Sequence, residues 1–428
     1  MAHYSRRNWP LMLRNLNLSR LQRSLRMLFS ALVIAGTCTG LQAADDSSTS
    51  PEQLVQAEKR LVEILAKIER HEINEAFRAV KALTEEVPNF RAAQLLYADM
   101  LRLRTGSAPI GEQLARSQAT PSKQNIGVAD KNIAPAEFYQ GLQSELQRRR
   151  QALLDAPPVG KIPSNFMRLS PSVRHAIAVD ASKSRLYVFA NRPEGVQLIS
   201  DFYVTIGRNG VHKRVEGDQR TPLGVYFVGR QIPGEKLPDL YGKGALTVNY
   251  PNDWDRMLGR TGSGIWLHGV PSDQFARVPQ ASDGCVVLSN PDIAFLMASI
   301  DRRTPVLITE KLDWVAPSWT EHPDSFTQEL ERWQTAWQQG DTSSLKALYS
   351  PELTEDGAAF TQRKRRLQSM GALSDKATKD ASIYQWQEDA GEIRIVNLHV
   401  AQGSTATVRQ YWRKQDGRWQ IFSEDMLS

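Results

Sequence analysis

The sequence predicts a multidomain chain, with a small α-helical region first, a mainly-β region in the middle and an α+β region at the end. Three observations indicate this arrangement. Apolar residues recur at a helical period between residues 51 and 104. Short runs rich in β-branched residues, separated by turn residues, fill residues 172–311. Helical patterns followed by long alternating segments occupy residues 322–428, an order typical of an α+β fold.

Residues 1–43 have the layout of a secretory signal peptide, with a basic start, an apolar core and an expected cleavage site after Ala43. The apolar core at residues 27–36 is too short to span a bilayer, which takes about 20 residues, so we expect cleavage rather than a retained anchor. All of the formal charge of +6 belongs to this leader, which has six arginines and no acidic residue. The remaining chain is neutral and gives no indication of nucleic-acid binding.

The helical region is expected to begin with a helix at Pro51 and to continue with helices at 73–83 and 90–103. Val87-Pro88-Asn89 separates the last two, since proline cannot continue a helix. The pattern resembles a tetratricopeptide-type hairpin, but one copy does not make a repeat array. A helical bundle that simply packs on the next domain explains it equally well.

Residues 105–135 are rich in Gly, Ser and Pro and are expected to form a linker. A polar helix is expected at residues 136–155, and we expect its Gln-Arg-Arg-Arg run at 147–150 to form a solvated face.

The central region is expected to be a β-sandwich or barrel, because many strands lie close together with little helix between them. The expected strands span residues 176–179, 185–189, 197–206, 224–228, 245–249 and 265–268, followed by a helix at 291–300 and a strand at 305–309. Residues 236–244 lack a period, and we expect a loop there that could cover a cleft.

Cys285 is the candidate nucleophile. The chain has two cysteines, and the other, Cys38, lies in the leader, so the mature chain would keep one thiol without a disulfide partner. Cys285 follows the turn residues Ser282-Asp283-Gly284 and precedes an apolar run. The alternative is an inert cysteine, because a free cysteine is commonly a small buried apolar residue.

His268 ends the expected strand at 265–268, and Gly269 follows it. The histidine and Cys285 thus lie at strand ends, where a sheet can present both to one cleft. An imidazole can take the thiol proton and hold the two groups as an ion pair, which would lower the pKa of the thiol. The N–H groups of Gly284 and Cys285 could stabilise an oxyanion. A purely structural histidine is the alternative.

These residues resemble the active-site signature of the L,D-transpeptidases, the YkuD-domain family: a histidine, a loop of similar length, and Ser/Thr-x-Gly-Cys. Residues 216–226 (E-G-D-Q-R-T-P-L-G-V-Y) resemble the G-D-x-x-T-P-x-G-x-Y strand of that domain, and residues 179–189 resemble its opening hairpin. The chain departs from the family at Asp283, where many members have a second histidine, and at Val287, where many have Arg or Asn.

The resemblance implies a periplasmic enzyme that acts on peptidoglycan stem peptides and uses no metal or other cofactor. Cys285 would form an acyl-enzyme and His268 would carry the proton. The expected oxyanion and positioning residues are Ser282, Asp283, Gly284 and Gly269, and the expected substrate contacts are Trp266, Tyr241, Arg277 and Asn290.

Several alternatives stay open. The acyl acceptor is a second stem, a lysine of an outer-membrane lipoprotein, or water. The flanking domains belong to fold types that often bind partners, so they could hold such a lipoprotein or another cell-wall protein. The same feature favours the rival interpretation, a catalytically silent cell-wall binding or scaffold protein. A different thiol hydrolase is a third interpretation.

The last region is expected to place helices at residues 325–337, 342–349 and 360–367 before strands at 381–388, 392–402, 404–414 and 418–425. Asp416-Gly417 is a hairpin signal between the last two strands. The patterns W-x-x-G-D…L-Y at 337–349 and Y-W-R-K-Q-D-G-R-W-Q-I at 411–421 resemble the nuclear-transport-factor-2-like fold, an α+β cone. Its tryptophans Trp386, Trp412 and Trp419 are expected in the core rather than around a ligand.

Overall fold

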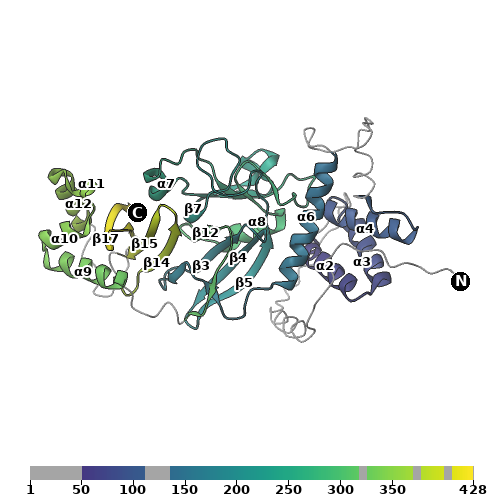
Figure 1. Cartoon of the computed structure of the whole chain (residues 1–428), viewed down its shortest axis with the longest axis horizontal. Helices are drawn as coiled ribbons and strands as arrows, with labels where there is room; N and C mark the ends of the chain where they lie inside the picture. The colour runs from purple at the N-terminus through teal and green to yellow at the C-terminus, as the bar shows by residue number, and fades with distance from the viewer. Residues whose placement is uncertain (1–50, 111–134, 318–324, 370–376, 400–406, 428) are drawn as a thin grey trace, which may run out of the picture.

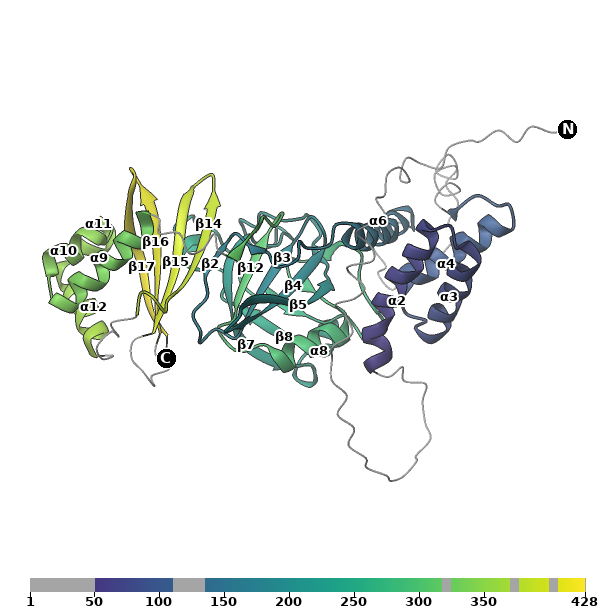
Figure 2. The same cartoon turned by 90° about the horizontal axis from the view of Figure 1, so that it is seen from below.

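A computed structural model describes residues 51–110, 135–317, 325–369, 377–399 and 407–427. Its three regions follow one another in a row, with the N-terminal helices at one end and the C-terminal sheet and helices at the other (Figure 1 and Figure 2). The expected signal peptide (1–43) and most of the expected linker (105–135) lie outside the described residues. None of the described helices is long and apolar enough to cross a membrane.

The predicted N-terminal helices are confirmed. They are α2 (Pro51–Glu69), α3 (Ile73–Glu86), α4 (Arg91–Arg104) and α6 (Pro135–Leu154). Each of α2, α3 and α4 turns an apolar face inward, and α3 buries Ala76, Val80 and Leu83 in their common core. The turn after α3 follows from Pro88, which has no N–H to continue the helix.

The central region is organised around one eight-stranded sheet with the strand order β11-β9-β8-β7-β12-β3-β4-β5. Its strands are β3 (His175–Asp180), β4 (Arg185–Arg192), β5 (Gly195–Tyr203), β7 (Gly224–Pro233), β8 (Gly244–Val248), β9 (Trp266–His268), β11 (Val286–Val287) and β12 (Pro305–Thr309). The helix α8 (Asn290–Ser299) follows β11, and its Ile293 and Leu296 join the core with one face of the sheet. The expected mainly-β fold is confirmed.

Some short strands were not predicted. The expected strand at 197–206 ends as β5 at Tyr203, and β6 (Ile206–Gly207) pairs instead with β10 (Gln280–Ser282). Segments of two or three residues carry no periodic signal, so a sequence pattern cannot identify them.

The C-terminal region forms the predicted α+β fold. The strands β14 (Ser382–Glu388), β15 (Gly391–His399), β16 (Thr407–Gln415) and β17 (Arg418–Leu427) form an antiparallel sheet, preceded in the chain by α9 (Ser325–Gln339), α10 (Thr342–Leu348), α11 (Pro351–Thr354) and α12 (Gly357–Ser369). These helices lie on the side of the sheet away from the central region (Figure 2). Trp386, Trp412 and Trp419 are buried, which confirms their expected place in the core.

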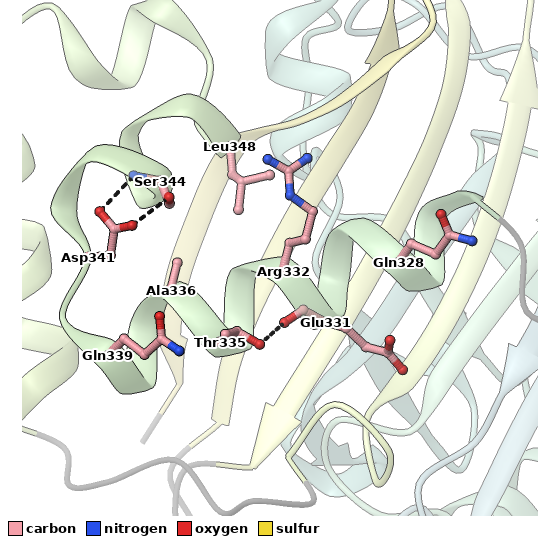
Figure 3. A pocket seen from close by; sticks show the side chains of 9 residues that line it. All are labelled: Gln328, Glu331, Arg332, Thr335, Ala336, Gln339, Asp341, Ser344 and Leu348. Atoms are coloured by element: carbon pink, nitrogen blue, oxygen red, sulfur yellow. Dashed lines mark hydrogen bonds between the residues drawn. The ribbon is translucent and has the colours of Figure 1, made fainter.

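The C-terminal helices also frame a hollow of about 320 Å³ between α9 and α10 (Figure 3). Its lining is mostly polar and includes Glu331, Arg332 and Asp341. The carboxylate of Asp341 already has hydrogen-bond partners, because it caps α10 by accepting the N–H groups of Ser343 and Ser344.

A segment that precedes the central sheet completes the C-terminal sheet. β2 (Phe166–Arg168) pairs antiparallel with β14 as the fifth strand. Just before it, β1 (Ile162–Pro163) pairs with β13 (Trp314–Val315), which follows the central sheet in the chain. Neither β1 nor β2 was predicted, because both are short and find their partners about 150 or more residues away.

The central and C-terminal sheets share one apolar core. Tyr384 and Tyr411 from the C-terminal sheet pack in a single buried cluster with Phe227 and Leu307 from the central one. The guanidinium of Arg409 lies over the ring of Phe227 at 3.4 Å from its centroid. The two regions are therefore joined by a continuous interior rather than by a linker alone.

The arginines of α6 do not form a solvated face, so that expectation was wrong. Arg149 is 1% exposed and forms ion pairs of 3.0 Å with Glu58 and Glu145. Its guanidinium also lies 3.9 Å from the ring centroid of Tyr203. Arg148 donates hydrogen bonds to backbone carbonyls of the loop after β3. The helix packs between the N-terminal helices and the sheet, where the carboxylates of Glu58 and of its own Glu145, with carbonyls of the loop after β3, compensate its charges.

Candidate active site

Cys285 is presented by a tight turn whose geometry requires a glycine. Gly284 has φ of +122°, and a Cβ at this position would lie 2.7 Å from the carbonyl oxygen of Arg220. The hydroxyl of Ser282 donates to the carbonyl oxygen of Cys285 at 2.6 Å and accepts the N–H of Gly284 at 3.2 Å. These bonds fix the backbone from Ser282 to Cys285, so the expected positioning roles of Ser282 and Gly284 have a structural basis.

Thr221 supports the turn through two hydrogen bonds of its hydroxyl group. It is fully buried, donates to the carbonyl oxygen of Gly284 at 2.9 Å and accepts the N–H of Gly207 at 2.8 Å. The sequence did not predict this role, although Thr221 lies in the segment 216–226. The sequence feature that could have identified Thr221 is its place in the Thr221-Pro222 pair of that segment.

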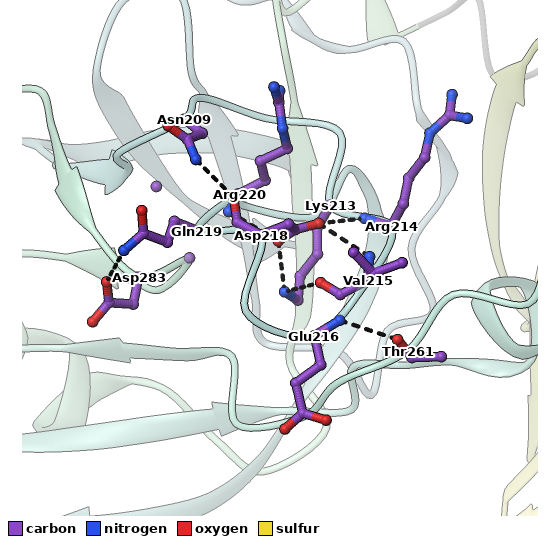
Figure 4. A network of polar contacts seen from close by, with 12 residues as sticks. Asn209, Lys213, Arg214, Val215, Glu216, Asp218, Gln219, Arg220, Thr261 and Asp283 are labelled. Atoms are coloured by element: carbon purple, nitrogen blue, oxygen red, sulfur yellow. Dashed lines mark hydrogen bonds and ion pairs between the residues drawn. The ribbon is translucent and has the colours of Figure 1, made fainter.

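The loop before Thr221 is organised by Asp218 (Figure 4). Its carboxylate accepts the Nζ of Lys213 at 2.8 Å and the backbone N–H groups of Arg214, Val215 and Arg220. Burial alone would raise the pKa of Asp218, but these hydrogen bonds outweigh it and lower the pKa.

The same loop reaches the catalytic turn through Asp283 (Figure 4). The side-chain amide of Gln219 donates to the exposed carboxylate of Asp283 at 3.1 Å. The residue that replaces the family's second histidine is thereby tied to the loop built on Asp218.

Cys285 directly precedes β11, which runs parallel to β9, the strand that ends in His268. β11 pairs with β9 so that Val286 is opposite Leu267 and Val287 is opposite His268. Val286 and Leu267 both enter the core. Because side chains alternate along a strand, continuing this register back by one residue sets Cys285 opposite Trp266, on the face to which His268 points.

The imidazole of His268 is held in one orientation. Its Nδ1 lies 2.7 Å from the carbonyl oxygen of Gly269, which places the proton on Nδ1 and leaves the lone pair on Nε2. Burial, helped by the charge of Arg277 and opposed by the Gly269 hydrogen bond, lowers the pKa of His268 to about 4. His268 is therefore a neutral base at pH 7.

Cys285 is a neutral thiol at rest. Its Sγ donates to the carbonyl oxygen of Gly264 at 3.4 Å. Burial raises the pKa of Cys285, and the charge of Asp283 adds to that rise. A backbone hydrogen bond from Trp266 and the charges of Arg277 and Lys213 oppose it. The low thiol pKa and the resting ion pair expected from the sequence were wrong, because both groups are desolvated. Proton transfer from this thiol must accompany its attack on a substrate.

Only part of the expected oxyanion hole is available. The N–H of Gly284 donates to Ser282 Oγ, so it is already used inside the turn. No described residue accepts the N–H of Cys285. The Cys285 N–H is accordingly the donor that this turn can offer to an oxyanion.

Tyr241 and Trp266 lie beside the histidine. The ring of Tyr241, in the short helix η3 (Asp239–Tyr241), lies 4.9 Å from the ring of His268 and 5.1 Å from that of Trp266. The loop expected at residues 236–244 is thus placed against the site. The two aromatic side chains are half-buried, as a surface that contacts substrate would be.

Asn290, an expected substrate contact, also positions the two loops beside His268. Its side chain accepts the N–H of Lys243 at 3.0 Å and donates to the carbonyl oxygen of Val270 at 2.9 Å. A Cβ at Gly269 would lie 2.3 Å from the Asn290 oxygen, which explains the glycine. The amide is therefore used to hold together the two loops that flank His268.

Arg277 lies in the loop between the two candidate catalytic residues. Its carbonyl oxygen accepts the hydroxyls of Tyr203 at 3.0 Å and Thr205 at 2.9 Å. Its charge lowers the pKa of both His268 and Cys285, so the guanidinium is within electrostatic reach of both. Within the described ranges, no cluster of three or more His, Cys, Asp or Glu side chains could hold a metal ion.

Comparison with known families identifies the two larger domains. Residues 174–308 match the family model of the YkuD domain, described as the L,D-transpeptidase catalytic domain. The central sheet is therefore similar to a YkuD domain. Residues 325–425 match the Cds6 C-terminal NTF2-like domain. Both resemblances predicted from the sequence are confirmed.

Solved structures with a related fold include Bd1075 from Bdellovibrio bacteriovorus, at 26% identity over 62% of this chain and 98% of that chain, with a TM-score of 0.47. The helical cell shape determining protein Pgp2 from Campylobacter jejuni is 20% identical over 63% of this chain and 96% of that chain, with a TM-score of 0.43. An L,D-transpeptidase from Mycobacterium smegmatis is 16% identical over 32% of this chain and 58% of that chain, with a TM-score of 0.21. No curated protein sequence matches the chain.

Proposed function

We propose that this protein acts on the cell wall, transferring acyl groups of peptidoglycan stem peptides through Cys285. The observation that carries the proposal is the pairing of β9 with β11 inside the YkuD domain, which puts a neutral His268 and the thiol on one strand face. Family members act on stem peptides, and this chain has the two groups that such chemistry needs. The expected leader at residues 1–43 supports a periplasmic location for the enzyme.

In the proposed reaction, the Sγ of Cys285 attacks the carbonyl carbon of the diamino acid that precedes a terminal D-alanine. His268 Nε2 takes the thiol proton as the C–S bond forms, because neither group is charged beforehand. The oxygen gains negative charge and accepts the N–H of Cys285. The C–N bond then breaks, and the imidazolium returns the proton to the amine of D-alanine. A thioester on Cys285 remains.

The thioester is resolved by an amine of a second stem or lipoprotein, or by water. His268 takes a proton from this acceptor as it attacks, and the thiol recovers the proton when the C–S bond breaks. Cross-linking, lipoprotein attachment and trimming share all steps up to this point. The acceptor alone decides which of them the enzyme performs.

The proposal is tested by the intact mass of the mature protein after incubation with tetrapeptide muropeptides and, separately, with a carbapenem. A covalent adduct on the wild type that is absent from Cys285→Ala supports the acyl-enzyme, and the muropeptide products identify the acceptor. A folded wild-type protein that forms no adduct and turns over no substrate rules the enzyme out.

The second candidate is a catalytically silent cell-wall binding or scaffold protein. One observation favours it: burial raises the pKa of Cys285, as for an inert structural cysteine. Peptidoglycan binding by Cys285→Ala that equals that of the wild type, together with no adduct on either, would establish this candidate instead.

A further inference from the structure

The loop that joins His268 to Cys285 is anchored in the N-terminal helical region. Phe275, near its middle, is 4% exposed and belongs to the core of α2, α3 and α4. Its ring centroid lies 4.1 Å from that of Phe90, and its N–H donates to the carbonyl oxygen of Asn89 at 3.3 Å. Asn89 and Phe90 lie in the connector between α3 and α4. The proposed reaction assigns no role to this connector.

A second anchor follows three residues later. Val278 packs with the small apolar cluster of Leu95, Tyr139 and Leu142. The approach of α6 is so close that a Cβ at Gly141 would lie 2.9 Å from Val278 Cγ1. A larger residue at position 141 would therefore displace the loop.

Arg277 lies between these two anchors. Its carbonyl oxygen is held by the hydroxyls of Tyr203 and Thr205, so the backbone at this point is fixed from the sheet side as well. Its guanidinium acts electrostatically on the two groups at the ends of the loop, His268 and Cys285. Displacement of the loop would carry this charge away from both.

The helical region is itself held firmly on the YkuD domain. Glu58 of α2 pairs with Arg149 of α6 at 3.0 Å and with Arg185 of β4. All three side chains are largely buried at this junction. A buried charge network requires a defined geometry, because each unpaired member would be costly.

We propose that the N-terminal helical region is a built-in positioning element of the catalytic site, in which Phe275, docked against Phe90, fixes the loop that joins His268 to Cys285 and carries Arg277. Phe275 is a positioning residue, acting through Arg277. The inference rests on the proposed function only in taking Cys285 as the reacting group.

The test measures the rate at which iodoacetamide alkylates Cys285 in the full mature chain between pH 6 and 10. Phe275→Ala removes the anchor, and Arg277→Gln removes one of the two charges, Arg277 and Lys213, that favour the thiolate. At pH values below the thiol pKa, each variant is expected to be alkylated about threefold more slowly than the wild type. This is equivalent to a rise of about half a unit in the thiol pKa. The double variant is expected to match the single variants, because both act through one charge. Phe275→Leu, which keeps an apolar anchor, is expected to restore most of the wild-type rate.

Gly141→Leu displaces the loop from the side of α6 without changing the loop, and it is expected to shift the alkylation profile in the same direction. Gln147→Leu, at an exposed position of the same helix, is its matched control and is expected to behave as the wild type. If Phe275→Ala does not fold, as judged by thermal melting, the comparison of Gly141→Leu with Gln147→Leu tests the proposal instead.

The proposal is overturned if folded Phe275→Ala titrates as the wild type, or if its shift adds to that of Arg277→Gln. Alkylation needs no peptidoglycan substrate, so a failed acyl-enzyme test with these shifts intact would reject the proposed function alone.

Discussion

The hydroxyl of Thr221 donates to the carbonyl oxygen of Gly284 at 2.9 Å, one residue before the thiol of Cys285. Thr221 is fully buried and lies on a segment about 60 residues away in the chain. Two distant segments are thereby joined directly beneath the candidate nucleophile.

Thr221→Val is expected to lower both stability and reactivity of the thiol. The substitution keeps the shape but removes the donor to Gly284 and the acceptor for Gly207, and each buried unpaired group costs about 1–3 kcal/mol. Urea unfolding measures the free energy of unfolding, and the rate of alkylation of Cys285 at pH 8 measures the reactivity of the thiol. Thr309→Val, which removes a hydroxyl bonded to the carbonyl of Lys311, is the control and is expected to change little. Normal alkylation by a destabilised Thr221→Val would show that the bond serves the fold alone.

Gly284→Ala is expected to be more damaging than Gly195→Ala. Both glycines have a strongly positive φ, +122° and +115°, so both substitutions introduce backbone strain of about 1–3 kcal/mol. Only at Gly284 would the new Cβ meet backbone, 2.7 Å from the Arg220 oxygen, whereas nothing lies within 4 Å at Gly195. The difference between their unfolding free energies measures this clash. Equal losses would mean that the turn relaxes, and Cys285 would then keep its reactivity.

The contribution of His268 to the stability of the folded protein is expected to fall as the pH drops from about 6.5 towards 4. Asp292 and Glu145, whose pKa values burial raises to about 7 and about 6, act in the opposite direction over this range. His268 has its pKa lowered to about 4 in the fold, so between these values the unfolded state binds a proton that the folded state does not. The contribution is about 3 kcal/mol and is present above the unfolded pKa. Unfolding by urea at pH 7 and pH 4.5 is compared between the wild type and His268→Gln. The variant is expected to lose less stability on acidification, because only the His268 contribution differs between the two proteins. His212→Gln, at an exposed position, is the control, and an equal effect of both variants would contradict the assignment.

The YkuD and NTF2-like domains are expected to unfold in one transition. Phe166 of β2 is 1% exposed and packs edge-on with Phe189 of the central sheet and Tyr384 of the C-terminal one. Phe166→Ala is therefore expected to cost about 3–5 kcal/mol and to lower a single melting temperature. Calorimetry checks this.

Truncation tests the same shared core. A chain that ends at residue 317 would expose the apolar face now covered by Tyr384 and Tyr411, and we expect it to aggregate. Two separate transitions in the whole chain, or a stable fragment made of residues 322–428 without β2, would contradict a common core.

The sequence by itself determined the fold class and the candidate dyad. Long segments with a clear period, such as α3 and β4, follow from local pattern alone, because one buried face specifies the helix or strand. Cys285 and His268 stand out through scarcity and motif, although their chemical roles stay predictions until an adduct is measured.

Only the tertiary structure decided what surrounds those groups. β2, β6 and β11 are too short for a period, and their pairing depends on partners distant in the chain. The pKa of Cys285 is raised because the fold buries it, which its neighbours in sequence do not reveal. The burial of the α6 arginines is likewise not apparent from their neighbours in sequence, because the carboxylate of Glu58 that pairs with Arg149 belongs to another helix. Local patterns specify elements, whereas burial and charge pairing arise only when distant elements meet.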